Sequence, residues 1–538
     1  ATDFFASGGT SLSATLVAGR LTERSGSHVG LRNLLRGRTV SRLAELIDTG
    51  FDDDVVPLPR RDDTSGPLPL AYPQRRLWVH NRVDPASAAY NVPAVLRLRG
   101  DVDVPALVAA VDQLVQAHEV LRTYYPLGPD GPVQAPVSAD AVPGLAVVPA
   151  ADDAAALVER FVTGSFDLTS EPGFRVALFG ATDGECYLAA SMHHAAVDGW
   201  SVRILLNDLV RAYQGEAIVD RSRLTYGDFS RWQAETLGDP DDPSSRFARQ
   251  LDYWRERLHG SPQPVAFPPA SPVSVCEPVH AVADDQLYAA VRGLAAGQQS
   301  TVLHVVHAAV AAAIAHRSGQ TDVVVGSPFH GRTSPSWEPV VGMFVNLLPV
   351  RVQISADSTP SMIIAQVRDA TIEAIEHGDV PYDDVVRAVR PSETRGGDAL
   401  TSVLLVNQAV LSGVHGRVAL NRIDESGRPS SATAEALQAG DAGVGYDLEI
   451  VVAENGRLEL TVIHAPRVSH EAARVIADDA MALLQSAVAD PDAPFLVRGE
   501  GLADMGIVEQ LADSLSESAV SASESYVAEV RRAFAEIL

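Results

Sequence analysis

The 538-residue sequence contains no lysine and only two cysteines, Cys186 and Cys276. Two cysteines cannot build the disulfide framework of a small secreted domain, and the N-terminus carries no secretory signal. No apolar run is long enough to span a membrane. These absences predict a cytoplasmic protein without a membrane partner. Arginine supplies all 42 basic residues, which suggests a GC-rich bacterial coding sequence.

Basic charge is scarce as well, because 42 basic residues stand against 69 acidic ones and the formal net charge is −27. A nucleic-acid binder displays basic patches that release counterions from phosphate, so we predict no nucleic-acid partner. The composition is that of a globular protein, with 46% hydrophobic and 21% charged residues. The length exceeds what one hydrophobic core normally serves, which predicts several folding units.

A hairpin is predicted before the most distinctive stretch, Ser-Met-His-His-Ala-Ala-Val-Asp-Gly-Trp at 191–200. The apolar segments 174–179 and 186–192 flank a turn at Asp183-Gly184. His193 and His194 then lie at the C-terminal end of the second strand. Successive strand side chains point to opposite faces, so only one of these histidines can face a given cavity. We predict that one histidine is catalytic and the other structural.

Asp198 follows His194 by four residues. At this distance its carboxylate can fix the loop by pairing with an arginine or with backbone N–H groups, and a helix predicted from about 202 to 213 would anchor the far end. An isolated His-His pair near an aspartate is also compatible with a hydrogen-bonded core feature. The stretch alone leaves both interpretations open.

Helices and strands alternate along residues 68–490, which predicts an α/β unit of two lobes, at about 68–238 and 246–490, with a seam between them. We place a two-sided active site at that seam. The elements expected from periodicity and capping are strands 90–99, 323–326, 403–406 and 448–452 and helices 103–115, 302–316, 361–376 and 472–488.

Residues 1–50 predict a small helical unit, followed by an acidic, proline-bearing linker at 51–67. The stretch Asp3-Phe4-Phe5-Ala6-Ser7-Gly8-Gly9-Thr10-Ser11-Leu12 opens a helix, and a second helical set begins at Val40. Read by itself, Ser11 is a helix N-cap. The pattern Asp-Phe-Phe-x-x-Gly-Gly-x-Ser-Leu resembles a thiolation (peptidyl carrier) domain of nonribosomal peptide synthetases, here without its first helix. That resemblance implies 4'-phosphopantetheine on Ser11, attached by a phosphopantetheinyl transferase.

Six stretches between 68 and 490 resemble, in order, the motifs of the condensation domain of the same synthetases. His-His-Ala-Ala-Val-Asp-Gly at 193–199 matches the HHxxxDG core. The resemblance implies a two-lobed, chloramphenicol-acetyltransferase-like pseudo-dimer that forms amide bonds. The other five matches are Tyr72–Trp78, His118–Thr123, Tyr226–Trp232, Val341–Asn346 with Pro349 and Arg351, and His377–Tyr382.

The sequence departs from the family at a few positions. A seventh motif is poorly represented at 390–400, Leu347 stands where a threonine is common, and Ala195-Ala196 are smaller than the usual aliphatic pair. These departures concern substrate preference more than reaction type. Epimerisation, cyclisation and non-catalytic recruiting relatives fit the motifs less well.

The bond being made suggests roles for the core motif. An acceptor amine attacks a donor thioester, and a histidine can accept the proton, hold the amine in line or hydrogen-bond the oxyanion. We hypothesise that His194 does the chemistry, His193 supports it, Asp198 fixes the loop and Gly199 relieves the turn. We predict no metal, because adjacent histidines on opposite strand faces cannot both reach one ion and the helical pair His304 and His307 is expected to be buried core.

The C-terminal residues divide into a linker at 491–525 and an amphipathic helix at 526–538. This helix resembles the first helix of a carrier domain. It either begins a downstream carrier or completes the one at the N-terminus.

The sequence therefore predicts a carrier–condensation fragment. It would join a donor thioester on Ser11 to the amine of an acceptor aminoacyl thioester on a downstream carrier, with neighbouring synthetase domains as partners. Two alternatives remain, a non-catalytic module that only docks carriers or tailoring enzymes and a stand-alone acyltransferase with soluble substrates. The attached carrier disfavours the second alternative.

Overall fold

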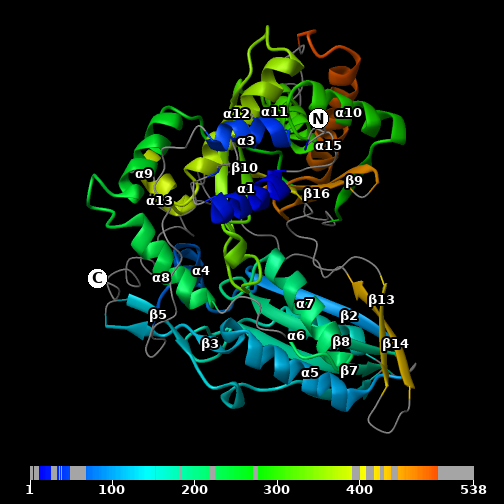
Figure 1. The fold of residues 1–538 in the computed structure, drawn as a ribbon. Helices are drawn as coiled ribbons and strands as arrows, with labels where there is room; N and C mark the ends of the chain where they lie inside the picture. The colour runs from blue at the N-terminus through cyan, green and yellow to red at the C-terminus, as the bar shows by residue number, and fades with distance from the viewer. Residues whose placement is uncertain are drawn as a thin grey trace, which may run out of the picture.

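A computed structural model describes the chain at residues 4, 11–25, 29, 33–34, 37, 39–48, 68–129, 131–151, 153–181, 185–218, 224–270, 277–390, 400–407, 417–423, 429–437, 446–454 and 456–494. The described chain forms two α/β lobes, one above the other in Figure 1, with two N-terminal helices on the upper lobe. The two-lobed α/β fold predicted from the sequence is confirmed. None of the helices in these ranges is both long and apolar enough to cross a membrane.

The N-terminal lobe is built on a six-stranded sheet of order β13-β14-β2-β8-β7-β6. Helices α5 and α7 share one core with one face of the sheet, and α6 packs on the other. A smaller sheet pairs β1, β3 and β4 with β5. The elements of this lobe are β1 (Leu68–Pro69), α4 (Tyr72–Val83), β2 (Asn91–Gly100), α5 (Val104–Ala117), η1 (Glu119–Arg122), β3 (Thr123–Tyr124), β4 (Leu127–Gly128), β5 (Gly131–Pro136), η2 (Ala139–Ala141), β6 (Ala146–Ala151), α6 (Ala154–Val162), β7 (Phe174–Ala181), β8 (Cys186–His193), α7 (Gly199–Tyr213) and α8 (Tyr226–Leu237).

Local sequence explains where these elements begin. Asp103 caps α5 by accepting a hydrogen bond from the backbone N–H of Ala106 at 3.0 Å, and a proline occupies the first turn. Thr225 and Asp228 form a reciprocal capping box at the start of α8. β7 and β8 pair antiparallel from Phe174↔Met192 to Gly180↔Cys186. The predicted hairpin therefore carries His193 to the end of a central strand.

The C-terminal lobe contains a second six-stranded sheet, of order β11-β10-β12-β15-β16-β9. Helices α10, α11, α12 and α15 bury one continuous core with it. The elements of this lobe are α9 (Arg246–Arg257), β9 (Val279–Val282), α10 (Asp285–Gly297), α11 (Val302–Ser318), β10 (Asp322–Phe329), η3 (Pro335–Trp337), β11 (Asn346–Gln353), α12 (Pro360–Glu376), α13 (Tyr382–Val389), β12 (Val403–Asn407), β15 (Leu448–Glu454), β16 (Leu458–His464) and α15 (His470–Ala489).

Two segments cross between the lobes. The hairpin of β13 (Arg417–Ile423) and β14 (Pro429–Leu437) leaves the C-terminal half of the chain and joins the lower sheet, where β14 pairs antiparallel with β2 (Figure 1). The second segment is the loop 330–345 between β10 and β11, which we call the crossing loop. The hairpin corrects the predicted lobe boundaries, because residues 417–437 belong to the sheet of the first lobe.

The N-terminal unit consists of α1 (Ser11–Ser25) and α3 (Val40–Asp48), with described residues between them. Ala14 and Ala18 of α1 share a buried cluster with Val29, Leu34 and Ile372 of α12. The unit therefore packs on the C-terminal lobe (Figure 1). The linker predicted at 51–67 and the helix predicted at 526–538 lie outside the described residues.

Candidate active site

His193 ends β8 and is buried, with 3% of its surface exposed. Its Nδ1 accepts a hydrogen bond from the backbone N–H of Ala195 at 3.0 Å, which fixes the tight turn after the strand. The rings of Phe166 and Tyr90 lie with their centroids 6.0 and 6.4 Å from the imidazole. Burial, with a smaller contribution from the neighbouring histidines, lowers the pKa of His193 to about 3. The ring is therefore neutral near pH 7.

His194 is half-buried at the start of the turn, and its backbone N–H donates to the carbonyl of Tyr90 at 2.8 Å. Its Nδ1 lies 2.8 Å from the carbonyl oxygen of Val197. A carbonyl oxygen only accepts, so Nδ1 must carry the hydrogen, and in the neutral ring Nε2 keeps a free lone pair. Within the described ranges no group is hydrogen-bonded to this Nε2. The geometry is that of a proton acceptor.

Asp198 is fully buried and caps α7 by accepting a hydrogen bond from the backbone N–H of Ser201 at 2.8 Å. Its carboxylate forms an ion pair with Arg332, with Nη1 and Oδ2 2.7 Å apart, and accepts from the backbone N–H of Phe344 at 3.1 Å. Burial alone would raise the pKa of Asp198, but the Arg332 charge and the hydrogen bonds outweigh it and lower that pKa. Both kinds of partner expected for Asp198, an arginine and backbone N–H groups, are present.

The crossing loop supplies this support from the other lobe. Arg332 also donates to Ser201 Oγ at 3.0 Å and to the carbonyl of Val340 at 3.1 Å. Two glycines allow the close approach. A Cβ on Gly331, whose φ is +66°, would lie 2.0 Å from the Phe344 carbonyl oxygen, and a Cβ on Gly342 would lie 1.9 Å from the ring of Tyr226. The loop is therefore fitted to the N-terminal lobe at its backbone.

Gln74 supports, from α4, the segment 194–198 between β8 and α7, which we call the histidine loop. It lies in α4 with no exposed surface, and its Nε2 donates to the carbonyl of Ala195 at 2.8 Å. Its Oε1 accepts from the backbone N–H of Ala71 at 3.1 Å. Because Ala195 also donates its N–H to His193, both backbone groups of this turn residue are hydrogen-bonded. The motif at 72–78 thus stabilises the motif at 193–199.

Four of the predicted motifs meet around one pocket at the seam. The pocket is lined from both lobes, and neither His193 nor His194 is among the lining residues. Ring contacts between α8 and the crossing loop close one side, with Phe229 and Phe344 centroids 4.4 Å apart. The motif residues at the pocket are Tyr72, Pro73, Phe229, Trp232, Phe344, Asn346, Gly378, Asp379 and Pro381.

The remaining motif residues hold elements together. The Nε2 of His118 lies 3.1 Å from a carboxylate oxygen of Asp208 in α7. Asn346 donates from Nδ2 to the carbonyls of Gly378 and Val380 at 2.9 and 2.8 Å. Arg351 pairs with Asp322 at 2.6 Å on the neighbouring strand. Gly199 begins α7 without a positive φ, so the structure shows no left-handed turn for it to relieve.

Both parts of the chain match known protein families. Residues 64–496 match the family described as Condensation domain, and residues 1–47 match the family described as Phosphopantetheine attachment site. The chain belongs to the condensation-domain family. In this chain the condensation domain follows a carrier domain of a nonribosomal peptide synthetase, as the sequence motifs predicted.

Curated relatives of this carrier–condensation chain are much longer. A dimodular nonribosomal peptide synthase of Bacillus subtilis is 30% identical over 510 residues, which cover 91% of this chain and 21% of the relative. An isonitrile lipopeptide synthase of Mycobacterium tuberculosis is 35% identical over 402 residues, covering 71% and 16%. The chain therefore spans about a fifth or less of these relatives.

Solved structures share the condensation fold at lower identity. The X-domain from teicoplanin biosynthesis aligns with a TM-score of 0.68 and 24% identity, covering 81% of this chain and 98% of that one. The first condensation domain of the calcium-dependent antibiotic synthetase aligns with a TM-score of 0.62 and 20% identity, covering 81% and 99%. These likenesses concern the fold.

The carrier domain is the attachment site for 4'-phosphopantetheine, and Ser11 fits the group. Ser11 is the first residue of the 15-residue helix α1. The positive end of a helix dipole favours a phosphate at that place. The group, when bound, supplies a thiol that holds an acyl chain as a thioester.

The sequence alone did not indicate Arg332 as the partner of Asp198 or Gln74 as the support of Ala195. The sequence predicted that an arginine could pair with Asp198, but it did not indicate which arginine. Arg332 lies 134 residues further along the chain, and a single Gly-Arg-Thr in a loop carries no periodic signal. Only the fold brings these residues to the histidines.

Proposed function

We propose that the chain forms an amide bond between a donor acyl group carried at Ser11 and the amine of an acceptor aminoacyl thioester on a downstream carrier. The observation that carries the proposal is the hydrogen bond from His194 Nδ1 to the Val197 carbonyl. It leaves the Nε2 lone pair of the neutral ring able to accept a proton from nitrogen. We also propose the domain limits 1–50 and 68–490, a cytoplasmic location, and a phosphopantetheinyl transferase and neighbouring synthetase domains as partners.

In the proposed reaction the acceptor nitrogen bonds to the donor carbonyl carbon and the carbon–sulfur bond breaks. His194 Nε2 takes the proton that the nitrogen must lose and returns it to the departing sulfur, so protons balance. In its neutral form Nε2 has no hydrogen and cannot donate to an oxyanion. The tautomer thus favours proton acceptance, or holding the amine in line, over oxyanion stabilisation.

The other residues of the motif hold His194 in place. His193 fixes the turn through Ala195, and Asp198 ties the loop to α7 and to the crossing loop. We assign them positioning roles, since His193 is buried with a pKa of about 3 and Asp198 is enclosed by its donors. Holding both tethered substrates in register contributes much of the rate.

The test is a reconstituted condensation reaction. The full chain is loaded at its carrier by a phosphopantetheinyl transferase with an acyl group and then mixed with an aminoacyl thioester acceptor, and the amide product is measured by mass spectrometry. We expect His194→Ala to lower single-turnover product formation about 10²- to 10⁴-fold. Full rate in this variant would exclude the catalytic assignment.

The same experiment addresses the alternative of a non-catalytic docking module. Loaded, folded wild-type chain that yields no amide with any of a panel of acceptors would favour that module. The solved X-domain structures share only the fold with this chain at 24% identity, so they do not favour it.

A further inference from the structure

We infer that the crossing loop couples carrier docking to the histidine loop, so that the docked carrier stabilises the conformation of the loop that positions His194. This inference rests on the proposed function and adds regulation of the same site. The loop touches the carrier on one side and the motif at 193–199 on the other. Two neighbouring residues of α1, Gly19 and Arg20, contact the loop.

Gly19 provides the closest of these contacts. A Cβ at this position would lie 2.8 Å from Cδ of Pro335 and 3.0 Å from the carbonyl oxygen of Thr333. Glycine in the middle of a helix is unfavourable relative to alanine, so a glycine that touches a neighbouring segment can have a packing reason. Here the reason is that only a residue without a side chain lets α1 lie against the loop.

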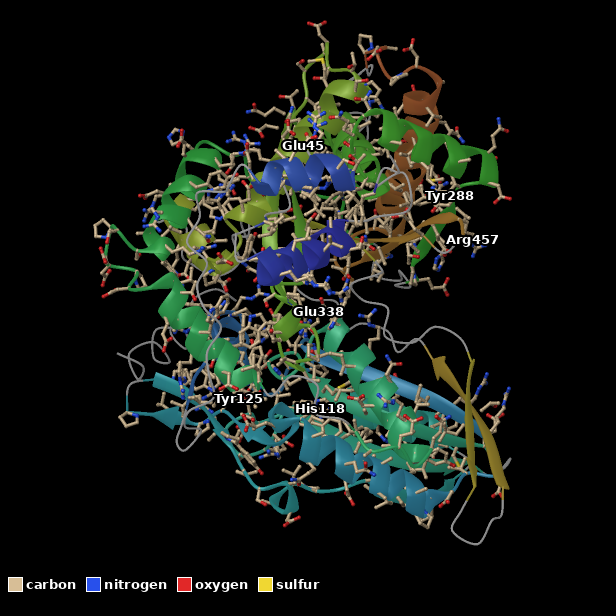
Figure 2. All side chains as sticks on the ribbon, viewed as in Figure 1. Glu45, His118, Tyr125, Tyr288, Glu338 and Arg457 are labelled. Carbon is tan, nitrogen blue, oxygen red and sulfur yellow. The ribbon has the colours of Figure 1, made fainter. Side chains whose placement is uncertain are left out.

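Arg20 adds a charged contact next to this one. Its Nη2 lies 3.0 Å from Oε2 of Glu338, with the arginine side chain 60% exposed and the glutamate 19% exposed. Figure 2 shows Glu338 between α1 and the lower lobe. An ion pair this exposed changes an equilibrium by no more than about five-fold, so it tunes the docking that the Gly19 contact permits.

The inner side of the same loop holds the histidine loop. The carbonyl of Glu338 accepts a hydrogen bond from Trp200 Nε1 at 2.9 Å, and Trp200 lies two residues after Asp198. Arg332, six residues before Glu338, pairs with Asp198 itself. The guanidinium of Arg203 lies 3.8 Å from the ring centroid of Trp200 and holds that ring in place. The crossing loop therefore contacts both the carrier helix α1 and the residues that position His194.

Gly19→Ala separates docking from carrier folding, because alanine strengthens an isolated helix while its Cβ collides with the loop. Gly293→Ala is the matched control, since Gly293 lies in helix α10 and a Cβ added there would meet no atom within 4 Å. Modification of both variants by a phosphopantetheinyl transferase, followed by intact mass, reports whether the carrier is still recognised. All measurements use the full chain.

The decisive readouts are amide hydrogen exchange in residues 194–201 and turnover of a soluble pantetheine thioester donor that bypasses the carrier. We expect Gly19→Ala to speed exchange in this segment several-fold and to slow the soluble donor about two- to five-fold, while Gly293→Ala changes neither. Arg20→Glu should act in the same direction more weakly, and adding Glu338→Arg should restore wild-type exchange.

Wild-type exchange and soluble-donor turnover in both Gly19→Ala and Arg20→Glu would overturn the coupling, even if carrier-borne turnover fell. That result would make the loop a docking surface only. It differs from failure of the proposed function, in which the wild-type chain itself would form no amide from either donor.

Discussion

Asp198 and Arg332 form an ion pair across the seam from which water is excluded, since neither side chain has any exposed surface. The aspartate belongs to the N-terminal lobe and the arginine to the crossing loop of the C-terminal lobe. Every oxygen of the carboxylate has a donor, with Ser201 and the Phe344 backbone N–H completing the set. The pair therefore joins the lobes at the base of the histidine loop.

Removing the arginine should destabilise the protein strongly. Arg332→Ala leaves a buried carboxylate without its cation, which typically costs about 3–5 kcal/mol. Adding Asp198→Asn to that variant should recover part of the loss, because the uncompensated charge disappears. Urea unfolding measures both, with Arg474→Ala as control, since the Arg474–Glu471 pair is solvent-exposed. Equal stability of Arg332→Ala and wild type would contradict the role of the pair.

Substitutions of the two histidines should have different effects, one mainly on stability and the other mainly on activity. His193→Ala deletes the acceptor for the Ala195 N–H in a buried turn, so we expect a loss of about 1–3 kcal/mol in unfolding free energy. His194→Ala should leave the thermal midpoint within a few degrees of wild type and lower only the rate. Thermal unfolding and single-turnover kinetics on both variants provide the measurement. If His194→Ala lowered stability and His193→Ala lowered only the rate, the positioning role would belong to His194 and the catalytic role to His193.

Buried histidines predict a loss of stability in mild acid. Burial, and to a lesser extent His304, lowers the pKa of His307 to about 3, against about 6.5 in the unfolded chain. Below pH 6.5 the His307 imidazole binds a proton in the unfolded chain but stays neutral in the folded chain. The free energy of unfolding therefore falls as the pH drops toward 3. The slope is about 1.4 kcal/mol per pH unit for each such histidine.

His307→Leu isolates one of these contributions. The pKa values of His193, His304 and His330 are also lowered to about 3. These histidines are present in both proteins, so their contributions to the pH dependence cancel in the comparison. Between pH 6 and 4.5 the variant should lose stability less steeply than wild type by about 1.4 kcal/mol per unit. Parallel curves in urea titrations would show that His307 is not buried neutral.

Gln74 offers a test of the support from α4. Gln74→Ala leaves the buried Ala71 N–H without its acceptor and the Ala195 carbonyl with only the longer hydrogen bond from the Tyr125 hydroxyl at 3.4 Å, which costs about 1–3 kcal/mol. A slower reaction with an unchanged pH profile would follow, because Gln74 positions the loop and does not titrate. Gln74→Glu should be worse, since it replaces the donor to Ala195 by an oxygen. A shifted pH profile in Gln74→Ala would point to a different role.

The sequence predicted those features that depend on neighbours along the chain. The hairpin of β7 and β8 follows from two apolar runs around a turn, and the start of α5 follows from Asp103 and the proline in its first turn. Different environments for the two histidines were expected from strand alternation, but β8 ends at His193, and His194 takes its place from the turn that follows. Each of these inferences needs only a short stretch of neighbouring residues.

Features that depend on distant segments could not be predicted this way. The strand β14 pairs with β2 across most of the condensation domain, and the sequence predicted neither this strand nor the sheet that it joins. Arg332 and Gln74 reach the histidine loop only after the lobes have packed. Gly19 reads as an ordinary helix interruption until Pro335 is found beside it.

The crossover hairpin also has a consequence for how the chain is made. β2 ends at Gly100, yet its partner β14 begins at Pro429, so a ribosome must add the whole intervening chain before the first sheet is complete. Until then β2 is an edge strand with unpaired backbone groups, the kind of surface that recruits other chains. Arg97 and Arg99 alternate along it. Charged side chains on an edge strand disfavour pairing with strands of other chains. The arginines therefore reduce the risk of aggregation until β14 has been synthesised.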